Sequence, residues 1–181
     1  MTKVLQWNCR SIRNKKQEII YLSNQYNPVL FAVAESWLRP DTLLRVPGFS
    51  CLRDDRDDGW AGTAILVRRN ISFSRFTLPP HSSAINIVAV RCFNITVVSV
   101  YIPHPNSNLI LEFSTLLTSL PCPLLVLGDF NIRHTMWGSE LCDSNSSLFL
   151  DKLDELNLCL LNDGTPTRRV SPSQSPSAPD L

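Results

Sequence analysis

The residues of this chain best suited to catalysis follow an apolar run in its second half. Residues 123–128 read Pro-Leu-Leu-Val-Leu-Gly and are followed by Asp129 and Asn131. A short apolar run that begins at a proline predicts a buried strand, and open α/β sheets bind ligands at the carboxyl ends of their strands. A carboxylate two positions from a carboxamide can activate a water and hold a phosphate oxygen in metal-assisted phosphate chemistry. The same pattern also fits a simple Asx turn, so this motif alone leaves both interpretations open.

Three more apolar runs end in a polar side chain that could take part in the same chemistry. These side chains are Asn8, Glu35 and Tyr101, which follow runs beginning at Val4, Val29 and Ile95. An acid after a run as apolar as residues 29–34 is costly to bury unless it meets a cation or a hydrogen-bond donor. The sequence therefore predicts one polar site to which several strand ends contribute.

The order and spacing of these motifs resemble the endonuclease/exonuclease/phosphatase superfamily. The motifs are Gln-Trp-Asn, Ala-Glu-Ser-Trp, Ser-Val-Tyr-Ile-Pro and Leu-Gly-Asp-Phe-Asn, at residues 6–8, 34–37, 99–103 and 127–131. Within the superfamily, the chain is most similar to the apurinic-endonuclease-like domain of non-LTR (LINE-type) retrotransposons. The Asn-Ile-Arg-His-Thr-Met-Trp-Gly segment at residues 131–138 and the glycine-rich residues 59–67 are typical of that branch.

The resemblance implies a role for each strand-end side chain. Glu35 would be the principal ligand of a Mg²⁺ (or Mn²⁺) ion, assisted by Asn8. Asp129 would orient and deprotonate the attacking water, and Asn131 would hold a phosphate oxygen. Tyr101 would donate a hydrogen bond to the phosphate or to the leaving group.

Three further residues beside the motifs are expected to contact the substrate, namely Arg10, His134 and Trp137. Arg10 stands where some family members carry an acid, and the basic residues that follow it either contact backbone phosphate or form a solvated helix face. Trp137 either stacks on a base or fills the core, whereas core packing is favoured for Trp7. The net charge of only +1 argues against tight, purely electrostatic DNA binding.

The carboxyl end is rich in proline and serine from residue 165 onward. Composition alone predicts a flexible tail. The resemblance instead makes residues 177–181 the start of a strand that carries Asp180, an acid of the metal and base region. It also implies a later Ser-Asp-His motif that residues 1–181 do not contain. We therefore expect one incomplete domain over residues 1–181, and the loss of such a phosphate donor typically lowers the rate on the order of 10²–10³-fold.

The arrangement of apolar segments establishes an α/β class. The resemblance makes it a four-layer α/β sandwich of two mixed sheets flanked by helices, lacking the last strands. Helices are expected at residues 14–26, 109–120 and 148–156, strands at 62–68, 85–91, 94–101 and 158–161, and an exposed loop between residues 41 and 59. The strands at 85–91 and 94–101 should form a hairpin.

Cysteine usage and hydropathy limit the cellular context. The six cysteines form no C-x-x-C pair, and Cys9, Cys92, Cys122 and Cys159 lie in or beside apolar runs. Buried free thiols are therefore expected, which favours a reducing compartment. No run approaches the roughly 18 apolar residues of a membrane span, and the start lacks the apolar stretch of a signal peptide. We expect an intracellular, nuclear protein.

The resemblance implies a Mg²⁺-dependent DNA endonuclease that nicks target DNA for retrotransposon insertion. Its partners would be DNA and a downstream reverse transcriptase domain of the parent protein. No association with a membrane is expected. Two alternatives remain at this level. The chain is either a catalytically inactive remnant that at most binds DNA, or another phosphoesterase of the superfamily, such as a phosphatase or sphingomyelinase. The segment that ends the fourth motif, residues 131–138, is typical of the retrotransposon branch and therefore weighs against another phosphoesterase.

Overall fold

The computed structural model describes residues 2–165 of the 181-residue chain. Eight strands and four helical segments follow one another along these residues. In chain order they are β1 (Val4–Asn8), α1 (Lys16–Tyr26), β2 (Leu30–Ala34), β3 (Phe49–Asp54), β4 (Thr63–Arg68), β5 (Ser74–Arg75), β6 (Asn86–Cys92), β7 (Ile95–Tyr101), α2 (Ser107–Thr118), β8 (Leu124–Asp129), the 3₁₀ turn η1 (Thr135–Trp137) and α3 (Ser146–Glu155).

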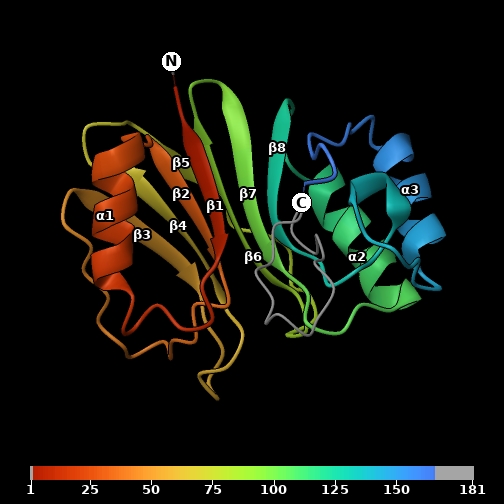
Figure 1. Ribbon diagram of the computed structural model, residues 1–181, viewed down its shortest axis with the longest axis horizontal. Coiled ribbons are helices and arrows are strands. Elements are labelled where there is room, and N and C mark those ends of the chain that lie inside the picture. Colours follow the sequence, from red (N-terminus) through yellow and green to blue (C-terminus); the bar gives the residue numbers. More distant parts are fainter. Residues whose placement is uncertain (1, 166–181) are drawn as a thin grey trace.

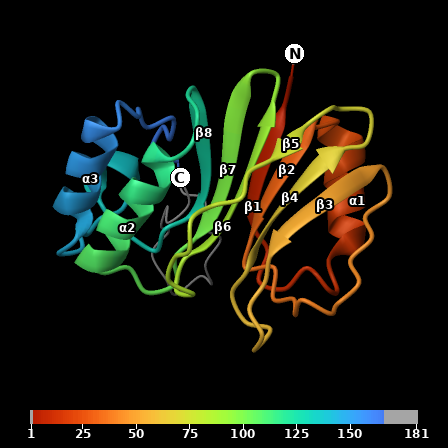
Figure 2. The same cartoon turned by 180° about the vertical axis from the view of Figure 1, so that it is seen from behind.

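The strands form two four-stranded mixed sheets that pack face to face. The first has the order β1-β2-β4-β3 and the second the order β5-β6-β7-β8. In each sheet one pair is parallel, β1 with β2 and β7 with β8, and the other pairs are antiparallel. Helix α1 covers the outer face of the first sheet, and α2 and α3 cover the outer face of the second (Figures 1 and 2). The predicted four-layer α/β sandwich is confirmed.

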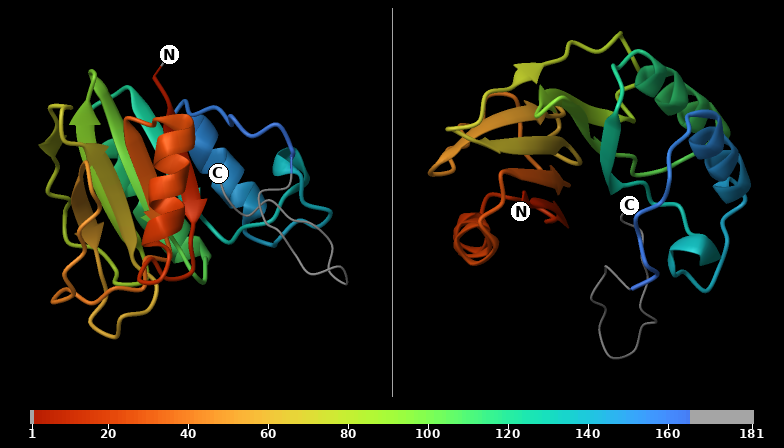
Figure 3. Two further views of the ribbon diagram at one scale, coloured as in Figure 1. Left: turned by 60° about the vertical axis from the view of Figure 1, so that its left-hand side comes forward. Right: turned by 90° about the horizontal axis from the view of Figure 1, so that it is seen from above.

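Three apolar layers hold the sandwich together, and the alternation of side chains along each strand creates them. Between the two sheets, Ala32 and Ile65 pack with Val88 and Val90. On the far side of the first sheet, the strands pack against α1 through residues such as Ile19. The third layer joins the second sheet to α2 and α3. Figure 3 shows the four layers from above.

Local sequence signals set several boundaries as predicted. Helix α1 ends at Tyr26, and the next residue, Asn27, has the left-handed φ of 47° that precedes Pro28. Strands β6 and β7 form the expected hairpin, whose two turn residues, Phe93 and Asn94, have φ values of 51° and 61°. Two successive left-handed residues match the right-handed twist of a tight hairpin.

Two predictions of local structure are wrong. Strand β3 lies inside the predicted loop of residues 41–59, because Phe49 and Leu52 are buried on its two faces and its polar residues are partly buried. Residues 158–161 join no sheet; Leu158 and Leu160 pack on the core under α2 and α3, but their backbone pairs with no strand among the described residues.

The cysteine prediction is half right. Cys9 and Cys92 are buried, as expected, whereas Cys122 and Cys159 are exposed. Cys122 lies between two prolines in the loop before β8, and Cys159 lies beyond the end of α3. Neighbouring apolar residues alone do not bury a side chain that sits in a connecting segment.

Buried polar side chains tie the two sheets together. The Thr63 hydroxyl in β4 lies 2.7 Å from the Ser99 hydroxyl in β7 and donates to the Val33 carbonyl at 3.0 Å. At the same end of the sandwich, the Asn86 side chain of β6 accepts a hydrogen bond from the Gly62 backbone N–H at 3.1 Å. These contacts fix the position of the strand ends that carry the candidate site.

Candidate active site

The parallel pairing in each sheet brings the predicted strand-end residues together. In the first sheet, Asn8 pairs with Ala34, the residue before Glu35. In the second sheet, Tyr101 pairs with Asp129. The carboxyl ends of the two parallel pairs therefore lie at one end of the sandwich, next to the inter-sheet contact of β1 with β8.

The side chain of Asn8 bridges two carboxylates from different sheets. Its Nδ2 donates to Glu35 Oε1 at 2.8 Å and to Asp129 Oδ2 at 2.5 Å. Glu35 and Asp129 are both buried, and Asp129 is 121 positions from Asn8 in the chain. The prediction that several strand ends build one polar site is confirmed by this contact.

Two further groups surround the Glu35 carboxylate. The indole Nε1 of Trp37 donates to Glu35 Oε2 at 3.1 Å, and the guanidinium of Arg10 lies 4.0 Å from Oε1. The Arg10 side chain is more than half exposed, so solvent weakens its attraction to the carboxylate. Both oxygens of Glu35 are thus held in place by donors from the chain itself.

Asp129 and Asn131 form the Asx turn that their spacing allowed. The Asn131 backbone N–H donates to Asp129 Oδ1 at 2.9 Å, and Asn131 Nδ2 donates to the Ile102 carbonyl at 3.1 Å. The turn does not compete with a catalytic role, because it uses one oxygen of Asp129 while the other faces Asn8. The two interpretations of the motif are therefore compatible.

The phenol of Tyr101 is held in its protonated form. Burial is the main cause of its raised pKa, and the negative charges of Glu35 and Asp129 raise the pKa further. A phenol that stays protonated at neutral pH can donate a hydrogen bond to an anionic oxygen. Tyr101 is therefore a donor at the site, as its predicted role requires.

Unusual backbone conformations concentrate around the site. Glu35 and Trp37 have φ values of 53° and 51°, Arg10 has 45° and Asn131 has 50°. Non-glycine residues adopt the left-handed region at a cost, and such residues gather where function constrains the chain. Here the left-handed residues turn the chain after β1, β2 and β8, so that side chains of consecutive loops converge.

The arrangement fits a divalent cation. Two buried carboxylates share one amide and have one exposed arginine nearby, so their negative charge is only partly offset. The Asn8 Oδ1 atom is buried without a hydrogen-bond partner, and an amide oxygen beside carboxylates is a ligand that Mg²⁺ and Mn²⁺ accept. Among residues 2–165 no cluster of three or more acidic, histidine or cysteine side chains adds to this set.

The residues predicted to contact the substrate lie in different surroundings. Arg10 lies beside Glu35 at the site. The His134 ring caps the 3₁₀ turn η1, where its Nδ1 accepts from the Met136 backbone N–H, and it packs on Trp137 at 5.0 Å between ring centroids. Asp180 lies outside the described residues.

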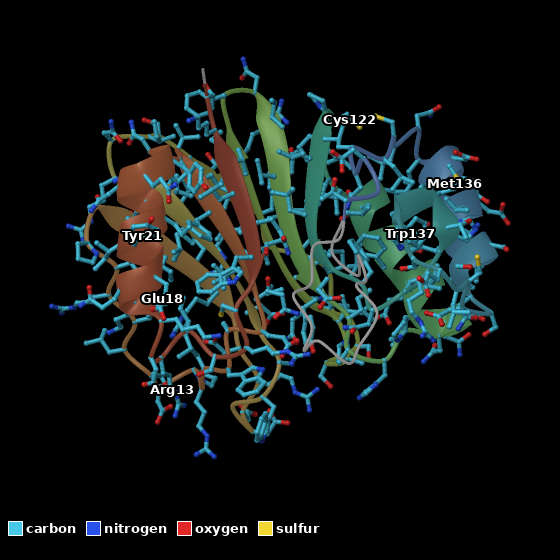
Figure 4. The ribbon with its side chains drawn as sticks, viewed as in Figure 1. Arg13, Glu18, Tyr21, Cys122, Met136 and Trp137 are labelled. Carbon is cyan, nitrogen blue, oxygen red and sulfur yellow. The ribbon has the colours of Figure 1, made fainter. Side chains whose placement is uncertain are left out.

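Trp137 packs in the hydrophobic core, and the prediction that it contacts the substrate is wrong. The side chain has no exposed surface, its Nε1 donates to the Ile132 carbonyl at 2.9 Å, and it packs edge-on against Phe149. Figure 4 shows it inside the half of the molecule that contains α2 and α3. A tryptophan with its ring and its N–H both satisfied inside the protein cannot stack on a base.

Sequence reasoning missed Trp37 as a functional residue. It is the last residue of the Ala-Glu-Ser-Trp motif, but a tryptophan two positions after an acid carries no signal for a side-chain hydrogen bond. The contact depends on the left-handed conformations of Glu35 and Trp37. Glycine is the usual sequence signal for such a conformation, and neither position carries one.

Comparisons with known proteins agree with this geometry. Residues 95–181 match the family model described as endonuclease-reverse transcriptase. The chain is 25% identical over 187 aligned positions to an RNA-directed DNA polymerase from the mobile element jockey of Drosophila funebris, covering 99% of the chain and 20% of the relative. The chain thus spans about a fifth of the length of the curated relatives it matches.

Solved structures show the same fold. The endonuclease domain of TRAS1, a telomere-specific non-LTR retrotransposon, matches with a TM-score of 0.78 and 23% identity, covering 99% of this chain and 82% of that one. A 3′ phosphatase from Neisseria, bound to a product DNA hairpin, matches with a TM-score of 0.65 and 18% identity over 86% of this chain and 71% of the other. No helix within residues 2–165 is long and apolar enough to cross a membrane.

Proposed function

We propose that the chain is a member of the endonuclease/exonuclease/phosphatase superfamily, in the branch of the non-LTR retrotransposon endonucleases, and that it hydrolyses phosphodiester bonds in DNA. The observation that carries the proposal is the amide bridge of Asn8 between Glu35 and Asp129. Two buried carboxylates from different sheets, held at hydrogen-bond distance from one amide, offer ligands for a metal ion and a base for a water, which metal-assisted phosphoryl hydrolysis uses.

Glu35 and Asn8 would hold a divalent cation. When bound, this ion supplies Lewis-acid stabilisation of the charge that develops on the phosphate. Mg²⁺ is the proposed ion and Mn²⁺ the alternative, because both prefer carboxylate and carbonyl oxygens. Trp37 and Arg10 orient the Glu35 carboxylate toward this role.

Asp129 would act as the base that orients and deprotonates the attacking water. Its turn with Asn131 fixes one oxygen, so the carboxylate cannot rotate freely. The protonated phenol of Tyr101 would donate to a phosphate oxygen or to the leaving group. Asn131 lies on the same loop and would donate its second Nδ2 hydrogen to another phosphate oxygen, the first being used by the Ile102 carbonyl.

The names of the relatives support a finer biological role. We propose that the reaction nicks target DNA to leave a 3′-hydroxyl that primes reverse transcription, with a reverse transcriptase domain downstream in the parent protein. The curated relatives carry the name RNA-directed DNA polymerase, and this chain aligns with about a fifth of their length. We further propose a nuclear location, which this role would require.

Supercoiled-plasmid nicking tests the proposal. The wild-type chain is expected to convert supercoiled plasmid to the open-circular form with Mg²⁺ and not with EDTA. Asp129→Asn should abolish nicking while keeping an acceptor for the Asn131 backbone N–H. Asp151→Asn, which changes an exposed acid of α3, is the matched control and should nick as wild type does.

The assay also separates the alternatives. Absence of nicking by a folded chain that still binds DNA would contradict the nuclease proposal and favour a non-catalytic DNA-binding role. Release of inorganic phosphate from a 3′-phosphorylated oligonucleotide without nicking would favour a phosphatase, the activity named for the Neisseria structure of similar fold.

A further inference from the structure

An open, polar pocket of about 460 Å³ lies next to the candidate active site. It is formed by the loop after β1, the loop that follows Glu35 and the loop before β4. Its lining includes Trp37 and Trp60 together with Arg13, Arg39, Asp41 and Asp58. In Figure 4, Arg13 extends from the end of the molecule at which these loops lie.

The exposed side chain of Trp60 is presented by an ordered turn. The Asp58 carboxylate accepts from the Trp60 backbone N–H at 2.9 Å and from the Arg56 guanidinium at 2.6 Å, and the Gly59 N–H donates to the Arg56 carbonyl at 3.0 Å. The hydrogen bonds from the Arg56 guanidinium and from the Trp60 N–H lower the pKa of Asp58, whose carboxylate is therefore ionised. Trp60 nevertheless stays 60% exposed, which is unusual for so large an apolar side chain on a structured turn.

Trp37 connects this pocket to the catalytic carboxylate. Its ring packs edge-on against Trp60, with the centroids 4.8 Å apart, while its indole N–H binds Glu35. A group stacked on Trp60 is thus separated from the Glu35 carboxylate by a single side chain. A ligand stacked on Trp60 would therefore lie beside the candidate active site.

The charges of the lining point to a neutral group with a polar edge. Arg13 and Arg39 supply donors, and Asp41 and Asp58 supply acceptors. The lining thus carries side chains of both signs, which suits the edge of a nucleobase because that edge offers both donors and acceptors. The aromatic face of Trp60 suits the flat face of a base, because stacking accepts every base.

Resting on the proposed nuclease function, we propose that this pocket takes an unstacked nucleobase of the substrate strand, stacked on Trp60 beside the scissile phosphate. The base would be one that the bound strand turns away from its neighbours. Trp60 then acts as a substrate-binding residue, and Trp37 transmits its position to Glu35.

Binding measured in EDTA tests this proposal without cleavage. Two single-stranded oligonucleotides of equal length are compared, one with normal bases and one made of abasic tetrahydrofuran residues, so that only the bases differ. Tryptophan fluorescence quenching and anisotropy report the affinity. Base stacking predicts that the base-bearing strand binds the wild-type chain about 5- to 100-fold more tightly.

Variants then locate the base. Trp60→Ala should remove most of that preference, because it should lower the affinity for the base-bearing strand and leave the affinity for the abasic strand unchanged. Trp60→Phe should retain much of the preference. Tyr21→Ala removes an equally exposed aromatic side chain from α1, apart from the pocket, and should change neither affinity (Figure 4).

The outcomes separate this proposal from the nuclease proposal. Equal weakening of both strands by Trp60→Ala, or no preference for the base-bearing strand in the wild type, overturns the base pocket even if plasmid nicking succeeds. A base preference that depends on Trp60 supports base binding in the pocket even if nicking fails. In that case only the proposal of DNA hydrolysis is refuted.

Discussion

Replacing Gly128 by alanine should destabilise the protein through a backbone clash directly before the candidate base. Gly128 pairs with Val100 across β7 and β8 and precedes Asp129. A Cβ atom at this position would overlap the Val100 carbonyl oxygen and would lie 2.8 Å from its carbonyl carbon and 2.9 Å from its Cγ1. The obstacle is mainly backbone, so a side-chain rotation cannot relieve it.

The size of the effect follows from the distances. Restoring an ordinary 3.4 Å contact to the carbonyl carbon at 2.8 Å alone requires a movement of 0.6 Å between the two strands, and the overlapping carbonyl oxygen requires more. Overpacking of a core costs about 1–3 kcal/mol, and weakened ladder hydrogen bonds add about 1 kcal/mol. We expect Gly128→Ala to lower the free energy of unfolding by about 3 kcal/mol, which corresponds to a fall in Tm of roughly 6–12 °C.

Thermal unfolding followed by circular dichroism measures this change against a matched glycine. Gly48 has a φ of +80°, but a Cβ there would meet only the flexible end of Arg68 at 3.4 Å. Gly48→Ala should therefore cost only the strain of the left-handed region, about 1 kcal/mol. A Gly128→Ala protein that melts no lower than Gly48→Ala would refute the reasoning.

A second background sharpens the test. Val100→Ala removes Cγ1 but leaves the carbonyl group, so Gly128→Ala should lower Tm by the same amount in that background as in the wild type. Rescue by Val100→Ala would mean that the side chain, and not the backbone, is the obstacle.

Three further predictions concern the site and its supports. Trp37→Phe keeps a ring against Trp60 but removes the donor to Glu35, so Mn²⁺ affinity measured by calorimetry should fall about 10- to 100-fold; unchanged affinity would contradict this orienting role. Thr63→Val leaves the Ser99 hydroxyl without its buried partner and should cost about 1–3 kcal/mol in urea unfolding, and adding Ser99→Ala should recover part of that loss. The raised pKa of Tyr101 means that the folded chain keeps the phenol proton, so stability is intact below the ordinary value of about 10 and falls as pH rises above it. An absorbance titration of wild type against Tyr101→Phe should show no phenolate from this residue near pH 10, and its appearance in the folded protein would be contrary evidence.

The sequence predicts the site well where a residue ends an apolar run. Asn8, Glu35, Tyr101 and Asp129 each follow a strand whose composition is unambiguous, and parallel pairing then places them together. Which side chains touch depends on the packing of one sheet on the other. The Asn8–Asp129 contact joins residues of different sheets, so no local pattern reveals it.

Prediction fails where local composition and tertiary environment disagree. The acids and arginines of residues 53–58 indicate an exposed loop, yet Asp55 is largely buried beside Arg53, and burial raises its pKa. Trp137 follows a strand in a polar loop, yet the loop folds back and buries it against Phe149. In both cases long-range packing decides the burial, and a sequence window does not contain that information.

The order of strands along the chain has a consequence for folding. Each sheet is built from one continuous stretch, residues 4–68 for the first and residues 74–129 for the second. Pairing within a sheet therefore needs only contacts of moderate sequence separation, whereas the contact of Asn8 with Asp129 spans 121 positions. The catalytic constellation is thus assembled only when two separately contiguous sheets dock, and hydrogen exchange at Asn8 and Asp129 would report that docking as a cooperative step of its own.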